Sequence, residues 1–512
     1  MASFIADAVQ IGPECRVLDP ACGDGVFLEA ALARGCKEVW GVEADPRLAE
    51  TARARLRHDP RAAVLCGDGL RCQNLHSSLS YGSLDAVIGN PPFSAGPGRI
   101  TDRSLLAEFQ LGAGAREGTG RPVEVLFVEQ FVRLTRPGGR IGIILPESIL
   151  SNNRHQAVRR YILDHTEVAA VVSLPRSAFR GTGTTARTVV LIAVRRQPPP
   201  SGQSPPLMAD LSSLEDSKAE GLRDALAGVL RELHPAPTQA SETAGAVRGV
   251  DHQVFRPDLA LEREGAVSAF SHRLDPGYWS PRFADALRDL RRCRLPLRPL
   301  GDFIEHITYG PIVTDGTDAA VRGLHPARSV LRVTQRQLLH SGLDLTTALA
   351  VPENGPWDSL RARIRPGDLL IARSGEKGLR AGKMALAGEL PSGVHAVVGC
   401  FVDLVRLRGI EPAVVLAFLK GIYGQAQVQR LASGVGAPNI SFRELRSVAV
   451  PVLPHAYEKA CRSLWEKAHS LHQAALRLPA GPQREAALRT ASAAMDELVG
   501  FMEELILGRK PA

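Results

Sequence analysis

The chain has 512 residues, a formal net charge of +8 and 44% hydrophobic residues, an ordinary balance for a globular protein of about three domains. No stretch approaches the roughly 18 consecutive apolar residues of a membrane span, and the first residues lack the pattern of a secretory leader. We therefore expect a cytoplasmic protein without membrane contacts. The eight cysteines are scattered, without a C-x-x-C pair or a His cluster, so neither a disulfide framework nor a bound metal is expected.

Four segments follow one another along the chain. Residues 1–195 alternate short apolar strands with helical patterns, as in an α/β domain with a mostly parallel sheet. Residues 196–255 open with "QPPPSGQSPP" and are interpreted as a linker with a short helix. Residues 256–455 change to short strands and turns, as in an α+β domain. Residues 456–508 carry two apolar seams around "LPAGP", which predict a helical hairpin, although two separate surface helices fit the same pattern.

A glycine-containing loop follows the first predicted strand. The strands of the first segment are expected at residues 16–18, 38–42, 63–66, 84–88, 140–145, 168–174 and 188–194. After the first of them, "DPACGDG" supplies Asp19, Ala21, Gly23 and Gly25 before a helix. Small residues let the backbone approach a ligand, and the helix N-terminus adds its positive end. The loop is a candidate cofactor site, although such a turn can also only reverse the chain.

Acidic residues end the next two predicted strands. Glu43 lies 24 positions after Asp19, in "GVEADP", and Asp68 follows the third strand in "LCGDGL". A carboxylate in the position of Glu43 accepts two hydrogen bonds from a ribose diol in dinucleotide folds, and Asp68 is able to accept from an exocyclic amine. A single acid at a strand end is usually a helix cap. Three in succession favour a binding site at the carboxyl edge of the sheet.

The fourth predicted strand ends in "GNPPF", which contains Asn90, Pro91, Pro92 and Phe93. Asn and Pro both favour turns, so the motif alone fits a strand end as well as a site. Its position decides in favour of a site, because open α/β sheets bind ligands at the carboxyl ends of their strands.

In this order, the motifs "DPACGDG", "GVEADP", "GDGL" and "GNPPF" resemble the S-adenosylmethionine-dependent amino-group methyltransferases of DNA, and within them the N6-adenine enzymes of the γ arrangement, which include type I modification subunits. "LTRPGGRIGIILPESIL" and "LPRSAFRGTGTTARTVVLI" are also similar to that family. The resemblance covers nearly all of residues 1–195. It implies a class I, Rossmann-like S-adenosylmethionine-dependent methyltransferase domain, with S-adenosylmethionine as cofactor at Asp19, Ala21, Gly23, Gly25, Glu43, Asp68 and Asn90.

The resemblance also implies a catalytic role for "NPPF". If the Asn90 side-chain oxygen and the Pro91 carbonyl each accept one N–H of an adenine amine, the nitrogen lone pair is freed to attack the sulfonium methyl. The fixed φ of proline preorganises that carbonyl, and Pro92 stiffens the loop. Phe93 stacks on the base, and Phe179 matches the second aromatic of the family, although it could equally be a core residue. Double-stranded DNA is the expected partner, and the target base must be flipped out.

"GDLLIARSGEKGLRAGKMALAG" and "RLASGVGAPNISFRELRSVAVPVLP" resemble the target-recognition domains of type I specificity subunits. Arg373, Lys377, Arg380 and Lys383 gather positive charge around glycine turns and are the candidate DNA contacts. For any one of them, a solvated loop is the simpler interpretation. The basic excess of the chain falls in residues 256–512, which suits a polyanion, although Arg-rich solvated surfaces give the same balance.

The expected function is site-specific adenine-N6 methylation of DNA in a restriction–modification or defence system. The chain either forms a homodimer through Tyr457 to Leu505 or works alone, and any cleavage belongs to a partner endonuclease.

Two alternatives stay open. One is a protein-glutamine or ribosomal-RNA amino-group methyltransferase, and the other is a DNA-binding specificity module without activity. The second arises because the γ family carries a cofactor-closing segment before the first strand, whereas only an apolar helix with Phe4, Ile5, Ala8 and Val9 precedes Arg16.

Overall fold

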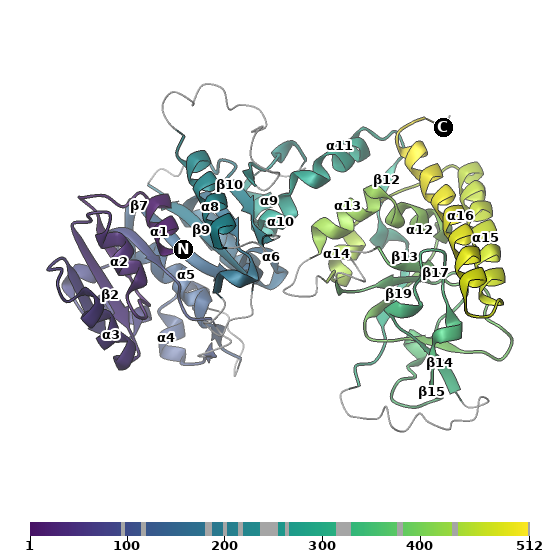
Figure 1. Ribbon diagram of the computed structural model, residues 1–512, viewed down its shortest axis with the longest axis horizontal. Coiled ribbons are helices and arrows are strands. Elements are labelled where there is room, and N and C mark those ends of the chain that lie inside the picture. The colour runs from purple at the N-terminus through teal and green to yellow at the C-terminus, as the bar shows by residue number, and fades with distance from the viewer. Residues whose placement is uncertain are drawn as a thin grey trace. The chain divides into compact units, whose positions relative to one another are not determined.

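The computed structural model describes residues 1–93, 98–113, 119–179, 187–197, 202–212, 214, 219–235, 254–261, 266–313, 329–375, 382–432 and 439–509. The chain divides into two compact units, Met1–Arg282 and Phe283–Ala512 (Figure 1). Each has its own apolar cores.

The first unit alternates strands and helices. Its strands are β1 (Arg16–Asp19), β2 (Glu38–Glu43), β3 (Ala62–Cys66), β4 (Leu84–Gly89), β5 (Arg99–Ile100), β6 (Arg121–Pro122), β7 (Thr135–Pro146), β8 (Thr166–Ser173), β9 (Thr188–Arg195), β10 (Leu207–Asp210) and β11 (Val254–Phe255). Its α-helices are α1 (Ala2–Ala8), α2 (Val26–Leu32), α3 (Pro46–Leu56), α4 (Arg103–Ala107), α5 (Val123–Leu134), α6 (Glu147–Ser151), α7 (Gln156–His165), α8 (Ala219–Leu233), α9 (Ala266–His272) and α10 (Pro276–Trp279). All seven strands expected from the sequence are present.

A nine-stranded sheet organises the first unit, in the order β11-β10-β8-β9-β7-β4-β1-β2-β3. Strands β7, β4, β1, β2 and β3 are parallel neighbours. Strand β9 runs antiparallel between β7 and β8. The buried, Val- and Ile-rich strands suit a parallel sheet because both of its faces are covered.

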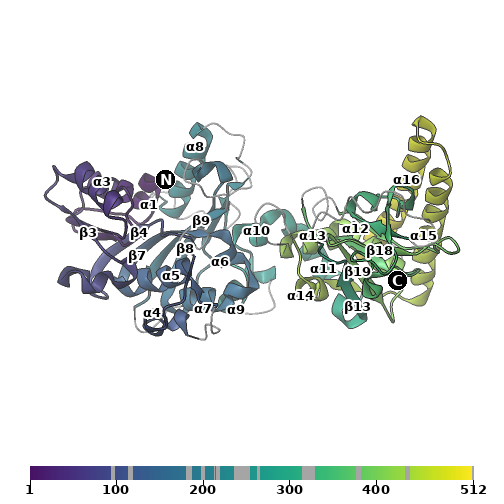
Figure 2. The ribbon, with the colours of Figure 1, turned by 90° about the horizontal axis from the view of Figure 1, so that it is seen from below.

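Helices cover both faces of this sheet (Figure 2). Helices α1, α2, α3 and α8 pack against one face of the sheet and share an apolar core with it. We call this core, which includes Ile5, Leu28 and Val229, the α1 layer. Helices α5 and α7 share the core on the opposite face, which includes Phe131 and Ile162. The predicted doubly covered α/β fold is therefore confirmed.

The sheet extends into the segment interpreted as a linker. Strand β10 pairs in parallel with β8, from Leu207 opposite Ala170 to Asp210 opposite Ser173, and β11 pairs with β10. The first compact unit therefore continues to Arg282, past the boundary expected at residue 195. The difference arises because edge pairing depends on a distant partner strand, which a local Pro-rich composition does not reveal.

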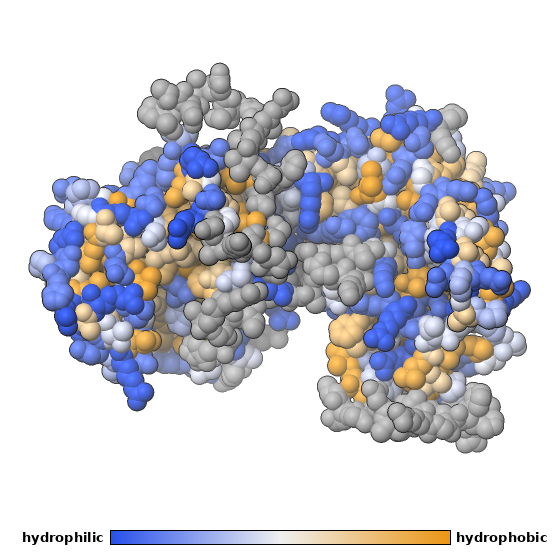
Figure 3. All heavy atoms as spheres, in the orientation of Figure 1, coloured by the Kyte–Doolittle hydropathy of each residue, from blue (hydrophilic) through white to orange (hydrophobic). Residues whose placement is uncertain are grey.

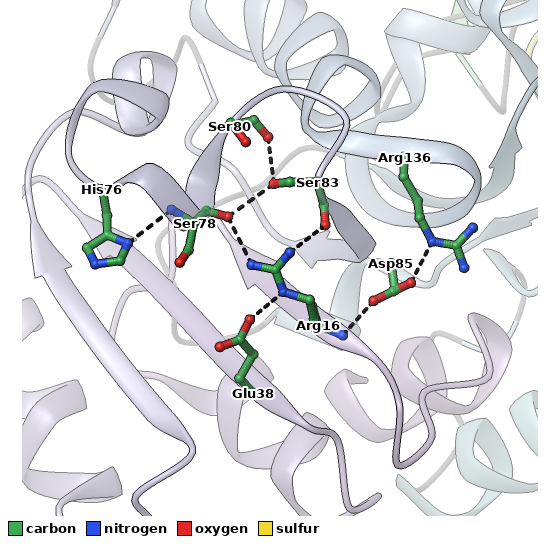
Figure 4. A network of polar contacts seen from close by, with 8 residues as sticks. All are labelled: Arg16, Glu38, His76, Ser78, Ser80, Ser83, Asp85 and Arg136. Atoms are coloured by element: carbon green, nitrogen blue, oxygen red, sulfur yellow. Dashed lines mark hydrogen bonds and ion pairs between the residues drawn. The ribbon is translucent and has the colours of Figure 1, made fainter.

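A polar network closes the amino-terminal edge of the sheet (Figure 4). The backbone N–H of Arg16 donates to Asp85 Oδ2 at 2.9 Å, and Arg136 Nε donates to Asp85 Oδ1 at 2.6 Å. The Arg16 side chain pairs with Glu38 and donates to the Ser83 carbonyl at 3.1 Å. Because these residues begin β1, β2 and β4, the network fixes the strands at the edge opposite their carboxyl ends.

The second unit combines small sheets with helices. Its strands are β12 (Leu297–Pro299), β13 (Ile304–Tyr309), β14 (Ser329–Val333), β15 (Leu349–Pro352), β16 (Leu369–Ala372), β17 (Met384–Leu386), β18 (Ala396–Val398), β19 (Val402–Leu407) and β20 (Ala449–Pro451). Its α-helices are α11 (Ala284–Arg292), α12 (Pro412–Lys420), α13 (Ile422–Leu431), α14 (Phe442–Ser447), α15 (His455–Leu476) and α16 (Pro482–Ile506). The strands form sheets in the orders β13-β19-β16-β17, β15-β14-β18 and β12-β20, as expected for an α+β domain.

Helices α15 and α16 form the predicted hairpin (Figure 1). Its apolar seams face inward: Cys461, Ala468, Met495, Leu498 and Met502 are buried in one core with α12. These side chains are therefore already covered within the unit. The homodimer expected through this hairpin stays a prediction.

Candidate active site

Four polar residues meet at the carboxyl edge of the first sheet. Asp19 and Glu43 are the last residues of β1 and β2. Asp68 lies two residues after the end of β3, and Asn90 directly follows β4. Since these strands are parallel neighbours, their carboxyl ends lie at the same edge, where α/β sheets bind ligands.

Asp19 is buried at the centre of this edge, with 1% of its surface exposed. Its Oδ1 accepts the N–H of Ala21 at 3.0 Å, whereas its buried Oδ2 has no hydrogen-bond partner in the described part of the chain. Burial raises the pKa of Asp19 to about 8; the Ala21 N–H opposes this rise, and the charge of Glu43 adds to it. A Cβ atom on Gly89 would lie 2.4 Å from Asp19 Oδ1, so glycine lets β4 approach the carboxyl group.

The loop after β1 takes a conformation that requires glycine. Gly23 and Gly25 have φ values of +54° and +89°, in the left-handed region. Glu43 holds this loop, because its Oε2 accepts the Gly23 N–H at 2.8 Å and its Oε1 accepts the Asp45 N–H at 2.9 Å. A carboxylate has about four acceptor positions, so Glu43 retains capacity for a ligand.

Asp68 is exposed and caps the short 3-10 helix Gly69–Asn74, its Oδ1 accepting the Leu70 N–H at 2.9 Å. The adjacent Gly69 touches the loop after β1: a Cβ there would lie 1.8 Å from the Pro20 carbonyl oxygen. The loops after β1 and β3 are therefore packed backbone to backbone, and Asp68 sits beside that contact.

The "NPPF" residues lie at the end of β4 with differing exposure. Asn90 is half-buried, and its buried Oδ1 has no hydrogen-bond partner within the described ranges. Pro91 is buried, Pro92 is exposed, and Phe93 is half-buried against the α1 layer. Phe179 ends the 3-10 helix Arg176–Phe179 and packs against the same layer. Both aromatics therefore lie on one side of the sheet.

Sequence reasoning missed Glu147, which follows β7, the strand next to β4. Burial raises the pKa of Glu147 to about 7, and the charge of Asp275 adds to this rise. Ser173, at the end of β8, is also buried there with an unpartnered Oγ. The signal was available for Glu147, since "IILPE" is another apolar strand followed by an acid.

The expected DNA contacts are only partly described. Arg373 follows β16 and lies over the rings of Tyr309 and Phe442, with its guanidinium carbon 4.0 and 5.3 Å from the ring centroids. Lys383 precedes β17 and is half-buried. Lys377 and Arg380 lie outside the described residues.

Within the described ranges, no group of three or more His, Cys, Asp or Glu side chains is arranged to hold a metal ion. Among the helices of that part of the chain, none is long and apolar enough to cross a membrane.

Comparison with known proteins locates the resemblance in the first unit. Residues 1–224 match the N-6 DNA Methylase family. A type II restriction enzyme and methyltransferase, RM.BcgI of Heyndrickxia coagulans, is 26% identical over 221 residues, covering 39% of this chain and 31% of the relative. The ribosomal RNA small subunit methyltransferase A of Geobacter metallireducens is 35% identical over 92 residues, covering 18% of this chain and 33% of the relative. The chain thus spans about a third of the length of these curated relatives.

Among solved structures, the type IIG restriction endonuclease BpuSI aligns with 100% of this chain and 65% of its own, at 12% identity and a TM-score of 0.45. The mostly parallel sheet and the family match agree on one fold, that of the class I S-adenosylmethionine-dependent methyltransferases. The match to the N-6 DNA methylase family covers residues 1–224, which lie within the first compact unit, and this fold uses S-adenosylmethionine as its methyl donor.

Proposed function

We propose that the protein transfers a methyl group from S-adenosylmethionine to the N6 amine of an adenine flipped out of duplex DNA, at sites chosen by the second unit. The observation that carries this proposal is a pair of buried oxygen atoms at the ends of neighbouring strands, Asp19 Oδ2 and Asn90 Oδ1, for which the described residues offer no donor. An unsatisfied buried acceptor costs about 1–3 kcal/mol. A substrate that brings N–H groups to this edge would recover that free energy.

The cofactor carries a matching set of donors. Its α-ammonium group suits the unpartnered oxygen of Asp19, and its ribose diol suits the remaining acceptor positions of Glu43. Its adenine amine suits Asp68, whose side chain is exposed beside the Gly69 contact. Gly23, where a Cβ would meet no atom within 4 Å, leaves the loop free of a side chain on the side open to a cofactor, whereas Gly25 lets the loop pack against Ala52 of α3.

Asn90 and Pro91 act on the target amine. When both oxygens accept its N–H groups, the lone pair is directed at the methyl sulfonium instead of into the purine ring. Phe93 offers a ring face to the flipped base at the edge of the α1 layer, and Phe179 approaches from the same layer.

Labelled methyl transfer into duplex DNA tests this function. Asn90→Ala is expected to lower kcat at least about 100-fold, as the loss of one preorganised polar contact to a transition state does. Asn74→Ala, a change of the same kind at an exposed position, is expected to retain wild-type activity. The labelled product is expected to be N6-methyladenine in a nucleoside digest. Equal transfer by wild type and Asn90→Ala would overturn the assigned mechanism.

A second candidate is methylation of adenine in RNA, favoured by the similarity of part of the chain to the ribosomal RNA methyltransferase. The same assay with structured RNA separates the two, because transfer to RNA and not to DNA would replace the first proposal. No cofactor binding in a titration with S-adenosylmethionine would favour a DNA-binding module without activity.

A further inference from the structure

A polar and aromatic cluster gathers at one end of the β13-β19-β16-β17 sheet. Three neighbouring strands contribute to it: Tyr309 on β13 pairs directly with Asp403 on β19, which pairs with Ile371 on β16. Arg373 lies two residues beyond Ile371, on the same face of the sheet. We call Tyr309, Arg373, Asp403 and Phe442 the arginine corner.

The guanidinium of Arg373 is held from three sides. It stacks over Tyr309, and Phe442 closes the corner, with the two ring centroids 5.8 Å apart. Asp403 lies behind it, with an Arg373 Nη1 to Asp403 Oδ1 distance of 3.7 Å, longer than a hydrogen bond. The N–H groups of Arg373 are therefore oriented but not used, since no hydrogen bond from its side chain is found with the described residues.

Asp403 is a buried carboxyl group. It is 0% exposed, and among the described residues neither of its oxygens has a hydrogen-bond donor. Burial raises the pKa of Asp403 to about 7, and the charge of Arg373 opposes this rise. Burying an acid without a hydrogen bond lowers the stability of the fold. Asp403 forms an ion pair with Arg373, and its burial is explained if it orients the Arg373 guanidinium.

Residues 439–442 pack against this corner. Ser374 forms an isolated bridge with Asn439, whose buried Oδ1 has no hydrogen-bond partner among the described residues. Ser441 begins α14 with a capping box to Glu444, which fixes the position of Phe442. Tyr309 is 36% exposed and the side chain of Arg373 is 20% exposed, so the corner is partly open to solvent.

We propose that Arg373 reads a guanine in the DNA sequence recognised by the protein, with Asp403 as a positioning residue; this rests on the proposed function. A guanidinium fixed in one plane presents two parallel N–H groups that match guanine O6 and N7 in the major groove. A phosphate contact requires net positive charge more than a fixed plane, and here a carboxylate offsets the charge. The geometry therefore favours a base over the backbone.

The test uses the full-length protein and a library of random duplexes, from which bound DNA is selected and sequenced. Arg373→Lys keeps the charge beside Asp403 but loses the planar pair of donors. We expect it to lose preference for guanine at one position, by about five- to 150-fold, with preferences elsewhere retained. Asp403→Asn is expected to weaken the preference at that same position.

Arg408→Lys is the matched control. Arg408 is exposed and directly follows the last residue of β19, five residues after Asp403, which is roughly 16 Å along an extended strand. It is expected to keep the wild-type preference. Circular dichroism and thermal unfolding check that every variant is folded. A uniform loss of affinity with a lower salt slope would assign Arg373 to a phosphate and overturn the proposal, as would an unchanged guanine preference.

Selection of bound duplexes keeps this result separate from the methylation reaction. A wild-type protein that selects a guanine-containing site without methylating it would refute the proposed activity and leave the reading of the base intact. A protein that methylates DNA while Arg373→Lys changes no base preference would do the reverse.

Discussion

Asp19 carries a proton at neutral pH in the protein without cofactor, because burial raises its pKa to about 8, above the value of about 4 in an unfolded chain. The folded first unit therefore binds one more proton than the unfolded chain between about pH 4 and pH 8. Its free energy of unfolding should fall as pH rises through this window, by at most about 1.4 kcal/mol per pH unit. Asp19→Asn is expected to remove that part of the pH dependence.

Urea unfolding at pH 6 and pH 8.5 without cofactor measures this difference. Asp24→Asn is the control, since it replaces a carboxyl group of the same loop by an amide at a side chain that is 43% exposed. If Asp19→Asn retained the full pH dependence of the wild type, the neutral state of Asp19 in the cofactor-free protein would be refuted.

At the scale of elements, the contact between the loops after β1 and β3 depends on Gly69. Its Cβ position lies 1.8 Å from a backbone oxygen of Pro20, so Gly69→Ala must move one loop. We expect a loss of about 1–3 kcal/mol in the unfolding free energy of the first unit and a cofactor affinity at least about tenfold weaker. Calorimetric titration with S-adenosylmethionine measures the affinity.

Gly67→Ala is the matched control for this loop. Its Cβ position lies 2.7 Å from Leu75 Cδ1, the end of a flexible side chain that can turn away. This variant should bind the cofactor nearly as the wild type does. Equal losses of cofactor affinity in both variants would contradict this prediction. They would show that the loop tolerates no added side chain at either position, whatever its contact with Pro20.

The sequence predicted the elements that local pattern controls. Apolar runs bounded by turn residues gave the seven main strands, and the acids after them gave the site edge, because parallel strands end together. The features that depend on pairing between distant strands could not be predicted from local pattern. Strand β10 joins the sheet through β8, about 37 residues earlier in the chain, and Asp403 lies inside an apolar strand, where only its cross-strand neighbours Tyr309 and Ile371 give it a role.

The expected homodimer, which stays a prediction, illustrates the same limit for the helical hairpin. Heptad-like seams in α15 and α16 show which face is buried, but not whether the partner is another chain or the same one. Here α12 covers Cys461, Ala468 and Leu498. The apolar pattern was therefore sufficient to predict the hairpin, but it did not identify the element that packs against the hairpin.

At the scale of the whole molecule, hydrophilic residues cover much of the described surface drawn in Figure 3, and each of the two units has apolar cores of its own. Two units with separate cores are expected to unfold in separate transitions. S-adenosylmethionine should raise only the first-unit transition, by about 2.7 kcal/mol at 100 times its dissociation constant.

Differential scanning calorimetry of the full chain, with and without S-adenosylmethionine, resolves the two transitions. Asp85→Asn identifies the first unit, because it weakens the bonds to Arg16 and Arg136 at the amino-terminal edge, far from the cofactor. It should lower the same transition that the cofactor raises, and Arg408→Lys should leave both midpoints unchanged. A single transition that moves as a whole with the cofactor would show that the units unfold together, so that ligand binding at the carboxyl edge of the first sheet would also stabilise the arginine corner.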